Sequence, residues 1–154
     1  MSATEEYVNS LMQLKPGELG LLRTHAGRGL DESVEGFDLF AGLWWPLRQK
    51  SSRAPRREVA WLIAKLYAFC PIPQSSGNTL AYQLSLCQPH DRIQAKFDEL
   101  LLLPIDSIEF SLQWALEQIA ANSNKLDWVK LTDDLSYWEH ENKRLEWAEQ
   151  FLNK

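Results

Sequence analysis

Apolar residues recur at intervals of three and four along almost the whole chain, which is the spacing of amphipathic helices. The sequence lacks a sustained alternation of apolar and polar residues rich in Val, Ile and Thr, the pattern of half-buried β-strands. The hydrophobic pattern therefore predicts an all-α protein. We expect two packed helical lobes that form an elongated helical bundle.

The first half of the chain predicts four helices, and Pro and Gly residues mark several of their ends. Pro16 suits the first turn of the second helix, and Gly27 and Gly29 mark its end. Residues 30–36 are expected to form a polar loop, and Pro46 is expected to end or kink the strongly apolar third helix. A solvated connector follows at 51–55. The predicted helices span about 4–14, 16–27, 37–47 and 56–70.

A stretch rich in Pro, Ser and Gly at residues 71–78 is the clearest break in the helical pattern. We expect it to link an N-terminal lobe, residues 1–72, to a C-terminal lobe, residues 79–154. Within the second lobe, Thr79, Asp106 and Asp127 are the predicted N-caps of three helices, because such side chains accept hydrogen bonds from the first turn. A further helix is expected between Pro89 and Pro104, and a last one ends near residue 152.

The chain has 154 residues, of which 45% are apolar, and a formal net charge of −5. This size suits one domain or two small lobes that share a core. No stretch approaches the about 18 uncharged apolar residues of a membrane span, and the first residues do not resemble a signal peptide. The two cysteines form no CxxC pair. We therefore expect a cytoplasmic protein with reduced thiols and no membrane partner.

Positive charge is concentrated in one segment of this acidic chain. Residues 48–65 carry a net charge of +5, so the rest of the chain sums to −10. Arg56 and Arg57 open a predicted helix, where acids are normally favoured, which suggests that something negative offsets them. A basic face on an acidic body indicates binding to a phosphate backbone. In the alternative interpretation the cluster is solvated and pairs with nearby acids: Asp31, Glu32, Glu35 or Asp38.

Two further pairs of cations extend this hypothesis. Arg23 and Arg28 lie five residues apart in the second predicted helix, and Arg92 and Lys96 stand at i and i+4 on one helix face. If the helices pack suitably, these pairs and the basic segment line one groove. The predicted nucleic-acid-binding residues are therefore Arg23, Arg28, Arg48, Arg53, Arg56, Arg57, Arg92 and Lys96.

No catalytic or metal-binding constellation stands out in the sequence. The histidines His25, His90 and His140 lie far apart and are expected to be surface or capping residues. There is no GxSxG motif, and the Gly27–Gly29 turn lacks the strand and the GK[ST] sequence of a phosphate loop. The acid pairs at 98–99 and 133–134 are expected on solvated helix faces. We predict no enzyme activity, no metal, no cofactor and no small-molecule substrate.

The chain contains seven tryptophans, a high number for its length. Exposed aromatic rings can stack on unpaired bases, so their predicted burial matters. Trp138 lies between Tyr137 and Glu139 and is the predicted exposed tryptophan. The other six lie within apolar runs and are predicted to be core residues: Trp44, Trp45, Trp61, Trp114, Trp128 and Trp147.

Several segments together resemble the small subunit of the type I-E CRISPR surveillance complex, Cascade, also called the CasB family. Residues 16–23 (PGELGLLR) resemble an early helix of that family, and residues 37–47 match its Trp-rich helix. Residues 77–81 (GNTLA) resemble the entry to its second half, and residues 89–104, with Arg92 and FDELL, a later helix. The Asp127–Trp128 pair followed by Trp138 is similar to its closing segment. The resemblance covers most of the chain.

The resemblance implies a non-catalytic, all-α subunit of a ribonucleoprotein in antiviral defence. Two copies would pack against the backbone and large subunits and hold the R-loop without reading sequence, which the guide RNA reads in the target DNA. Arg23, Arg92 and the Arg56–Arg57 pair fall on basic positions of the family. The chain departs from some relatives in having no arginine at 107–121 and in its overall acidity.

Two other classes of function remain open. A helical protein adaptor without nucleic-acid contact would use residues 105–154, which hold ten acids against five bases, to dock a basic partner. A helical metal-dependent hydrolase would need carboxylates that converge from several elements. Salt-titrated binding of non-specific DNA distinguishes the adaptor, and metal analysis with a nuclease assay distinguishes the hydrolase.

Overall fold

The computed structural model describes residues 2–32 and 34–152 of the chain. The chain divides into two compact units, Met1–Pro71 and Ile72–Lys154. Throughout the described residues the regular elements are helices, apart from one isolated β-bridge between Gln74 and Leu126. The prediction of an all-α protein is therefore confirmed. Within the same residues, no helix combines the length and the hydropathy that crossing a bilayer requires.

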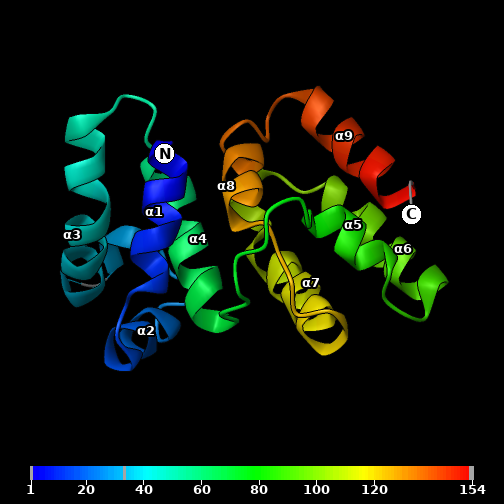
Figure 1. Ribbon diagram of the computed structural model, residues 1–154, viewed down its shortest axis with the longest axis horizontal. Helices are drawn as coiled ribbons and strands as arrows, with labels where there is room; N and C mark the ends of the chain where they lie inside the picture. The colour runs from blue at the N-terminus through cyan, green and yellow to red at the C-terminus, as the bar shows by residue number, and fades with distance from the viewer. Residues whose placement is uncertain (1, 33, 153–154) are drawn as a thin grey trace. The chain divides into compact units, whose positions relative to one another are not determined.

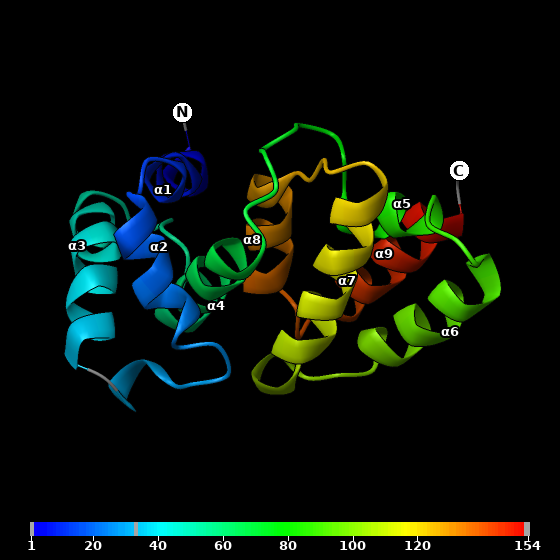
Figure 2. The same ribbon diagram turned by 90° about the horizontal axis from the view of Figure 1, so that it is seen from below.

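The described helices of the first unit are packed around α4, which contacts α2 and α3 and buries ten of its 13 residues. Figures 1 and 2 show α1 and α2 between α3 on one flank and α4 on the other. Pro16 opens α2, as predicted. The bounds are α1 (Ala3–Met12), α2 (Pro16–Arg23), η1 (Leu30–Glu32), α3 (Val34–Lys50) and α4 (Arg57–Phe69).

Buried polar and aromatic side chains connect these helices. The Tyr7 hydroxyl of α1 donates to the main-chain oxygen of Ala60 in α4 over 2.6 Å, and burial raises the pKa of this phenol. His25 is buried, but its Nδ1 lies 2.8 Å from the Leu21 oxygen in the last turn of α2, so it is a capping residue, as predicted. Gly36 allows α3 to approach this ring, because a Cβ there would lie 2.8 Å from His25 Nε2.

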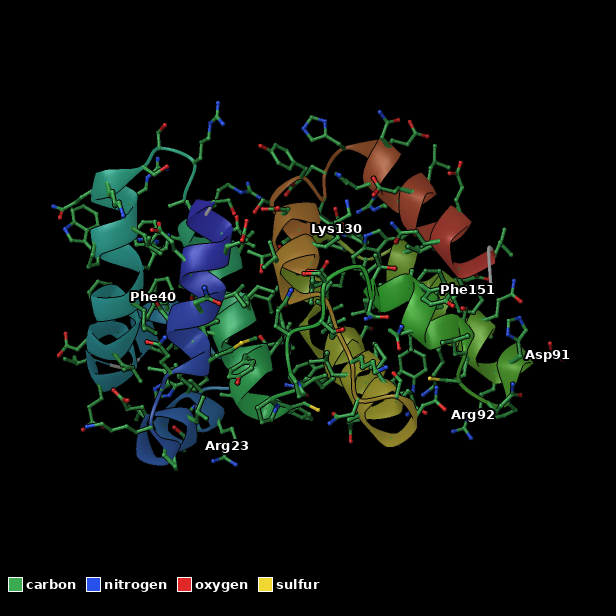
Figure 3. All side chains as sticks on the ribbon, viewed as in Figure 1. Arg23, Phe40, Asp91, Arg92, Lys130 and Phe151 are labelled. Carbon is green, nitrogen blue, oxygen red and sulfur yellow. The ribbon has the colours of Figure 1, made fainter. Side chains whose placement is uncertain are left out.

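The described helices of the second unit are arranged around α5, which contacts α6, α7 and α9. Phe97 of α6 stacks on Phe151 of α9 with ring centroids 4.6 Å apart, and His90 also stacks on Phe151. Phe151 is labelled in Figure 3. The predicted N-cap Thr79 is confirmed, since its side chain accepts a hydrogen bond from the Tyr82 N–H. The bounds are α5 (Leu80–Ser85), α6 (His90–Leu101), η2 (Ile105–Ser107), α7 (Glu109–Asn122), α8 (Trp128–Ser136) and α9 (Glu141–Leu152).

Asp127 joins the segment after Pro71 to the start of α8. Its Oδ1 accepts hydrogen bonds from the Lys130 main chain and the Gln74 side chain, which confirms it as an N-cap. Its Oδ2 accepts a third from the Gly77 N–H over 2.9 Å. Burial raises the pKa of Asp127, but the hydrogen bonds from Gln74, Gly77 and Lys130 lower it by a larger amount. The pKa of Asp127 is therefore lower than that of a free aspartate.

A second carboxylate of α8, Asp134, lies at the centre of a buried network and is 1% exposed. Its Oδ2 accepts from Trp147 Nε1 over 2.8 Å, and its Oδ1 pairs with Lys130 at 2.9 Å and with Lys143 at 3.3 Å. Both lysines also pair with Glu146. Burial lowers the pKa of Lys130, but its hydrogen bonds to Glu146 and Asp134 raise it by more. The prediction of a solvated acid pair is therefore wrong for this residue.

Several predicted helix boundaries are also wrong. Helix α3 begins at Val34, inside the predicted loop 30–36, and it continues to Lys50, so Pro46 does not end it. Pro46 and Gly42, the residue four positions earlier, are both exposed, so water can hydrate the Gly42 oxygen that loses its helical partner. Asp106 does not cap α7, which begins after Ile108; it lies in η2, where its carboxylate accepts a hydrogen bond from the Ser107 hydroxyl.

Candidate nucleic-acid interface

The eight cations that the sequence singled out all have exposed side chains. Six of them belong to the first unit and two to the second. Exposure is required of a residue that contacts phosphate, so the structure is compatible with the predicted role at each position.

The main concentration of charge lies in what we call the basic segment, residues 48–57, which runs from the last turn of α3 to the first residue of α4. It contains five cations and no acid. All five side chains are exposed: Arg48, Lys50, Arg53, Arg56 and Arg57. Residues 51–56, between the two helices, form a non-helical connector close to the predicted one at 51–55. Ala54 and Pro55 are buried, so the prediction that the connector is solvated is wrong for these two residues.

Two hydrogen bonds from α3 hold this connector in place. Arg48 donates to the Ser52 oxygen over 2.8 Å, and Trp44 Nε1 donates to the Pro55 oxygen over 2.6 Å. Both donors lie in α3, which anchors the connector at its beginning and near its end. The basic segment is therefore fixed against the first unit by hydrogen bonds at both ends.

Acids near the basic segment compensate part of its charge. Lys50 pairs with Glu6 at 3.1 Å, and Arg57 pairs with Glu58 at 3.6 Å. Three of these four side chains are more than half exposed, and pairs of this kind are screened by water and salt. A phosphate that offers better geometry can therefore compete for either cation.

Lys65, which the sequence counts within the same basic region, is 5% exposed and does not contribute to the surface. Its Nζ donates to the Arg28 oxygen over 2.9 Å and lies 5.4 Å from the centroid of Trp61. The indole N–H of Trp61 donates to the same oxygen. Long side chains of α4 thus hold the turn that carries Arg28.

Arg28 lies beyond α2, which ends at Arg23, so the prediction that both belong to one helix is wrong. The turn after α2, residues 24–27, ends at Gly27, whose φ of 77° is one that glycine adopts readily. Arg23 is the last residue of α2 and projects from its end (Figure 3). The two guanidiniums are therefore placed by a helix end and by the turn that follows it.

In the second unit, Arg92 and Lys96 lie one turn apart on α6, as predicted from their spacing. Lys96 Nζ stands 5.3 Å from the centroid of Trp114 on α7, a cation–π contact that leaves the side chain exposed. Arg92 projects from α6 in Figure 3.

The exposure of two tryptophans is the opposite of the prediction, and two others predicted to be core residues, Trp44 and Trp114, are only partly buried. Trp138 is fully buried because its indole N–H donates to the Leu103 oxygen and its ring packs on Trp147. Trp45, predicted to be a core residue, is 52% exposed. The sequence does contain a signal for this: the apolar residues of α3 occupy two faces, and a helix at the surface of a small unit can bury only one of them.

Trp45 lies at an apolar pocket of about 370 Å³ in the first unit. We call it the aromatic pocket. The near-parallel rings of Phe40 and Trp44, 5.8 Å apart, belong to its lining, and Trp44 is fixed by its bond to Pro55. The lining residues are Phe37, Phe40, Ala41, Trp44, Trp45 and Arg57.

In the part of the chain that the structure describes, no group of three or more His, Cys, Asp or Glu side chains is arranged to hold a metal ion. His140 is exposed and packs against Tyr137, and His90 packs against Phe151. The arrangement of exposed cations remains the feature with clear binding chemistry.

Comparison with known proteins identifies relatives over nearly the full length. The family model described as CRISPR-associated protein Cse2 matches residues 18–152. No curated protein sequence matches the chain significantly.

Solved structures resemble the whole chain. CasB from Thermus thermophilus is 24% identical with a TM-score of 0.73, and each chain covers 100% of the other. CasB from M. ruber is 21% identical with a TM-score of 0.77 over 98% of this chain and 93% of that chain. A chain of E. coli Cascade bound to a PAM-containing double-stranded DNA target is 18% identical, with a TM-score of 0.70 over 95% of this chain and 91% of that one. At these identities the likeness establishes the fold.

Proposed function

The chain belongs to the CRISPR-associated protein Cse2 family, and we propose that it is the non-catalytic small subunit of a Cascade complex. In this role it binds nucleic acid without sequence specificity and stabilises the R-loop. Its residues supply charge and shape, and base pairing with the guide RNA supplies the sequence specificity.

The observation that carries this proposal is the basic segment. Five exposed cations within ten residues, with no acid among them, stand on a chain of net charge −5. Lys and Arg contacts to phosphate give affinity that does not depend on sequence, which is what a strand-holding subunit requires. Arg23 and Arg28 extend the proposed contact surface in the first unit. Arg92 and Lys96 are the proposed contacts of the second.

The proposed partners follow from the same role. The subunit packs against the backbone and large subunits and against a second copy of itself, and it contacts the guide RNA and the target DNA. The E. coli relative was solved within Cascade bound to a double-stranded DNA target, which supports this assignment. The complex is proposed to act in the cytoplasm, without a membrane partner, a cofactor or a small-molecule substrate.

The test is a salt titration of DNA binding by the full chain and by the assembled complex. If the five cations of the basic segment each bind one phosphate, log K should fall with log salt at a slope of about −4.5 for duplex and about −3.5 for single strands. The variant R53A/R57A removes two of these contacts, and its duplex slope should be shallower by about 1.8. The matched control K15A/K125A removes two exposed lysines outside the basic segment.

The result decides between the proposal and its main alternative. If the control retains wild-type affinity and slope while R53A/R57A loses both, the basic segment binds phosphate. If DNA binding does not depend on salt concentration, or if R53A/R57A leaves it unchanged, the helical adaptor is the better account. DNA cleavage by the purified chain with added divalent metal would contradict the non-catalytic role.

A further inference from the structure

Helix α3 has a second apolar face that the first unit does not bury. Gly36, Phe40 and Leu47 form the buried side. Val34, Phe37, Ala41 and Trp45 follow at spacings of three, four and four, which places them on one helical face. Val34, Phe37 and Trp45 are 78%, 43% and 52% exposed. A contiguous group of large exposed apolar residues marks an interaction site, whereas single exposed apolar residues are normal on a protein surface.

This exposed face leads into the aromatic pocket, whose walls are preformed. Phe40 is fully buried, and Trp44 is held by the hydrogen bond from its indole N–H to the Pro55 oxygen. The two rings of Phe40 and Trp44 are inclined by only 12°. Trp45 adds a wall tilted by 50° from Trp44. A planar ligand could therefore enter without the fixed side of the pocket having to rearrange.

The aromatic pocket has few polar lining groups. Among the described lining residues, Arg57 carries the single charge, and the other five are apolar. Such a lining can hold a flat apolar face, but it has few groups with which to read the edge of a ligand by hydrogen bonds. The Arg57 guanidinium, which pairs with Glu58 at 3.6 Å, supplies a site for an anion at the pocket.

The basic segment runs directly past this pocket. Its last residue, Arg57, lines the pocket, and Pro55 is bonded to the pocket residue Trp44. A ligand with a flat face in the pocket and repeated negative charges along the segment would match both features. A single strand of nucleic acid has this composition, since a base can stack on the aromatic rings while neighbouring phosphates meet the arginines.

We propose that the aromatic pocket holds one unpaired base of a single-stranded nucleic acid, stacked on Trp45, while Arg57 and the basic segment bind the adjacent phosphates. This inference rests on the proposed function and specifies the form of the ligand. The shortage of edge-reading groups makes the pocket tolerant of base identity. A duplex has its bases paired and stacked, so it can use the arginines but not the pocket.

A protein side chain is the competing occupant, and charge favours the nucleic acid. A peptide helix could fill the pocket with an aromatic or aliphatic residue and pair one acid with Arg57. It would contact few of the five cations of the basic segment unless acids recurred along it at the same spacing. Phosphates recur along every strand by their covalent structure.

The experiment compares three probes with the full chain at low salt: a thymidine oligonucleotide, the same backbone with abasic sites, and a duplex of equal length. The tested variants are W45A and W45F, and the matched control is F110A, which truncates an exposed aromatic residue in the second unit. W45A should weaken thymidine oligonucleotide binding by about 5- to 150-fold, the equivalent of one lost base–aromatic stack. It should leave duplex binding, abasic binding and the salt slope unchanged.

Other outcomes separate the inference from the proposed function. W45F should retain most of the affinity, because a smaller aromatic ring still stacks, and F110A should behave as wild type. If the wild-type chain binds all three probes equally and W45A changes none of them, the pocket proposal is overturned while phosphate binding stands. If no probe binds at any salt concentration, the proposed function itself fails. If W45A prevents incorporation into the nucleic-acid-free protein complex, the pocket is a protein-docking site and the inference is wrong.

Discussion

Substituting Asp134 by asparagine should destabilise the second unit by about 2–3 kcal/mol, because one side chain serves three donors there. Its Oδ2 accepts from the buried indole N–H of Trp147, and its Oδ1 accepts from Lys130 and forms an ion pair with Lys143 at 3.3 Å. An asparagine offers one oxygen and one NH₂ group. In either orientation, the NH₂ group faces a donor: the indole N–H in one case and two ammonium groups in the other.

The magnitude follows from what each donor can recover. A hydrogen bond to a charged partner contributes about 1.5–3 kcal/mol, and if the asparagine oxygen stays with Trp147, the hydrogen bond from Lys130 and the ion pair with Lys143 are both lost. Lys130 and Lys143 keep their pairs with Glu146, and their side chains are 34% and 25% exposed, so part of this loss is regained from Glu146 and water. The expected loss in the free energy of unfolding is therefore smaller than the sum of the lost interactions.

Hydrogen exchange read by mass spectrometry would localise this effect. Amides of α8 and α9 should exchange about 30- to 150-fold faster in D134N if they exchange through opening of the second unit, while those of α1–α4 keep their protection. The control D98N makes the same substitution at an exposed position of α6 and should change stability by less than about 0.5 kcal/mol. Equal protection in D134N and D98N would refute the assignment of Asp134 as the centre of the network.

Three further predictions concern single residues. A Cβ at Gly36 would lie 2.8 Å from the buried His25 ring, so G36A should lower the free energy of unfolding by about 1–3 kcal/mol. At Gly42 no atom lies within 4 Å of an added Cβ, so G42A should raise the free energy of unfolding by about 0.5–1 kcal/mol. Urea midpoints measure both changes. Y7F removes a buried hydrogen bond to a main-chain oxygen and should cost about 1 kcal/mol by the same measurement. Hydrogen bonds lower the pKa of Asp127 in the folded chain, so the ionised carboxylate stabilises the fold. This contribution to the free energy of unfolding is complete above the unfolded pKa of about 3.9 and is lost as the pH falls through the folded pKa. The wild-type urea midpoint should therefore fall more between about pH 5 and pH 2 than that of D127N.

Helix ends could be predicted from the sequence where a local side chain determines them. Pro16 opens α2, and Thr79 and Asp127 cap α5 and α8, because the required acceptor or fixed φ belongs to the residue itself. Asp106 carries the same chemistry, yet α7 starts after Ile108. A capping residue shows that a helix can begin at that point, and packing decides whether it does.

Burial was predicted less well, because it depends on partners that are distant in the chain. Trp138 has polar neighbours in sequence, but its indole N–H meets a carbonyl oxygen 35 residues away and its ring packs on Trp147. Lys65 shares its helix with the exposed Arg57 and is nevertheless buried by a contact to residue 28. Neither contact can be predicted from the local pattern of polar and apolar residues.

The candidate interface shows the same division between charge and geometry. The sequence identified the cluster of cations, because charge density is a property of composition. It could not reveal that Arg48 and Trp44 each donate a hydrogen bond to the connector that carries Arg53 and Arg56. These bonds order the connector before any ligand binds, so phosphate binding would not have to supply that ordering free energy. For this reason W44F, which removes the donor but keeps an aromatic ring, should weaken binding of both single strands and duplex without changing net charge. Unchanged affinity of W44F for both would show that order in the connector makes no contribution to binding.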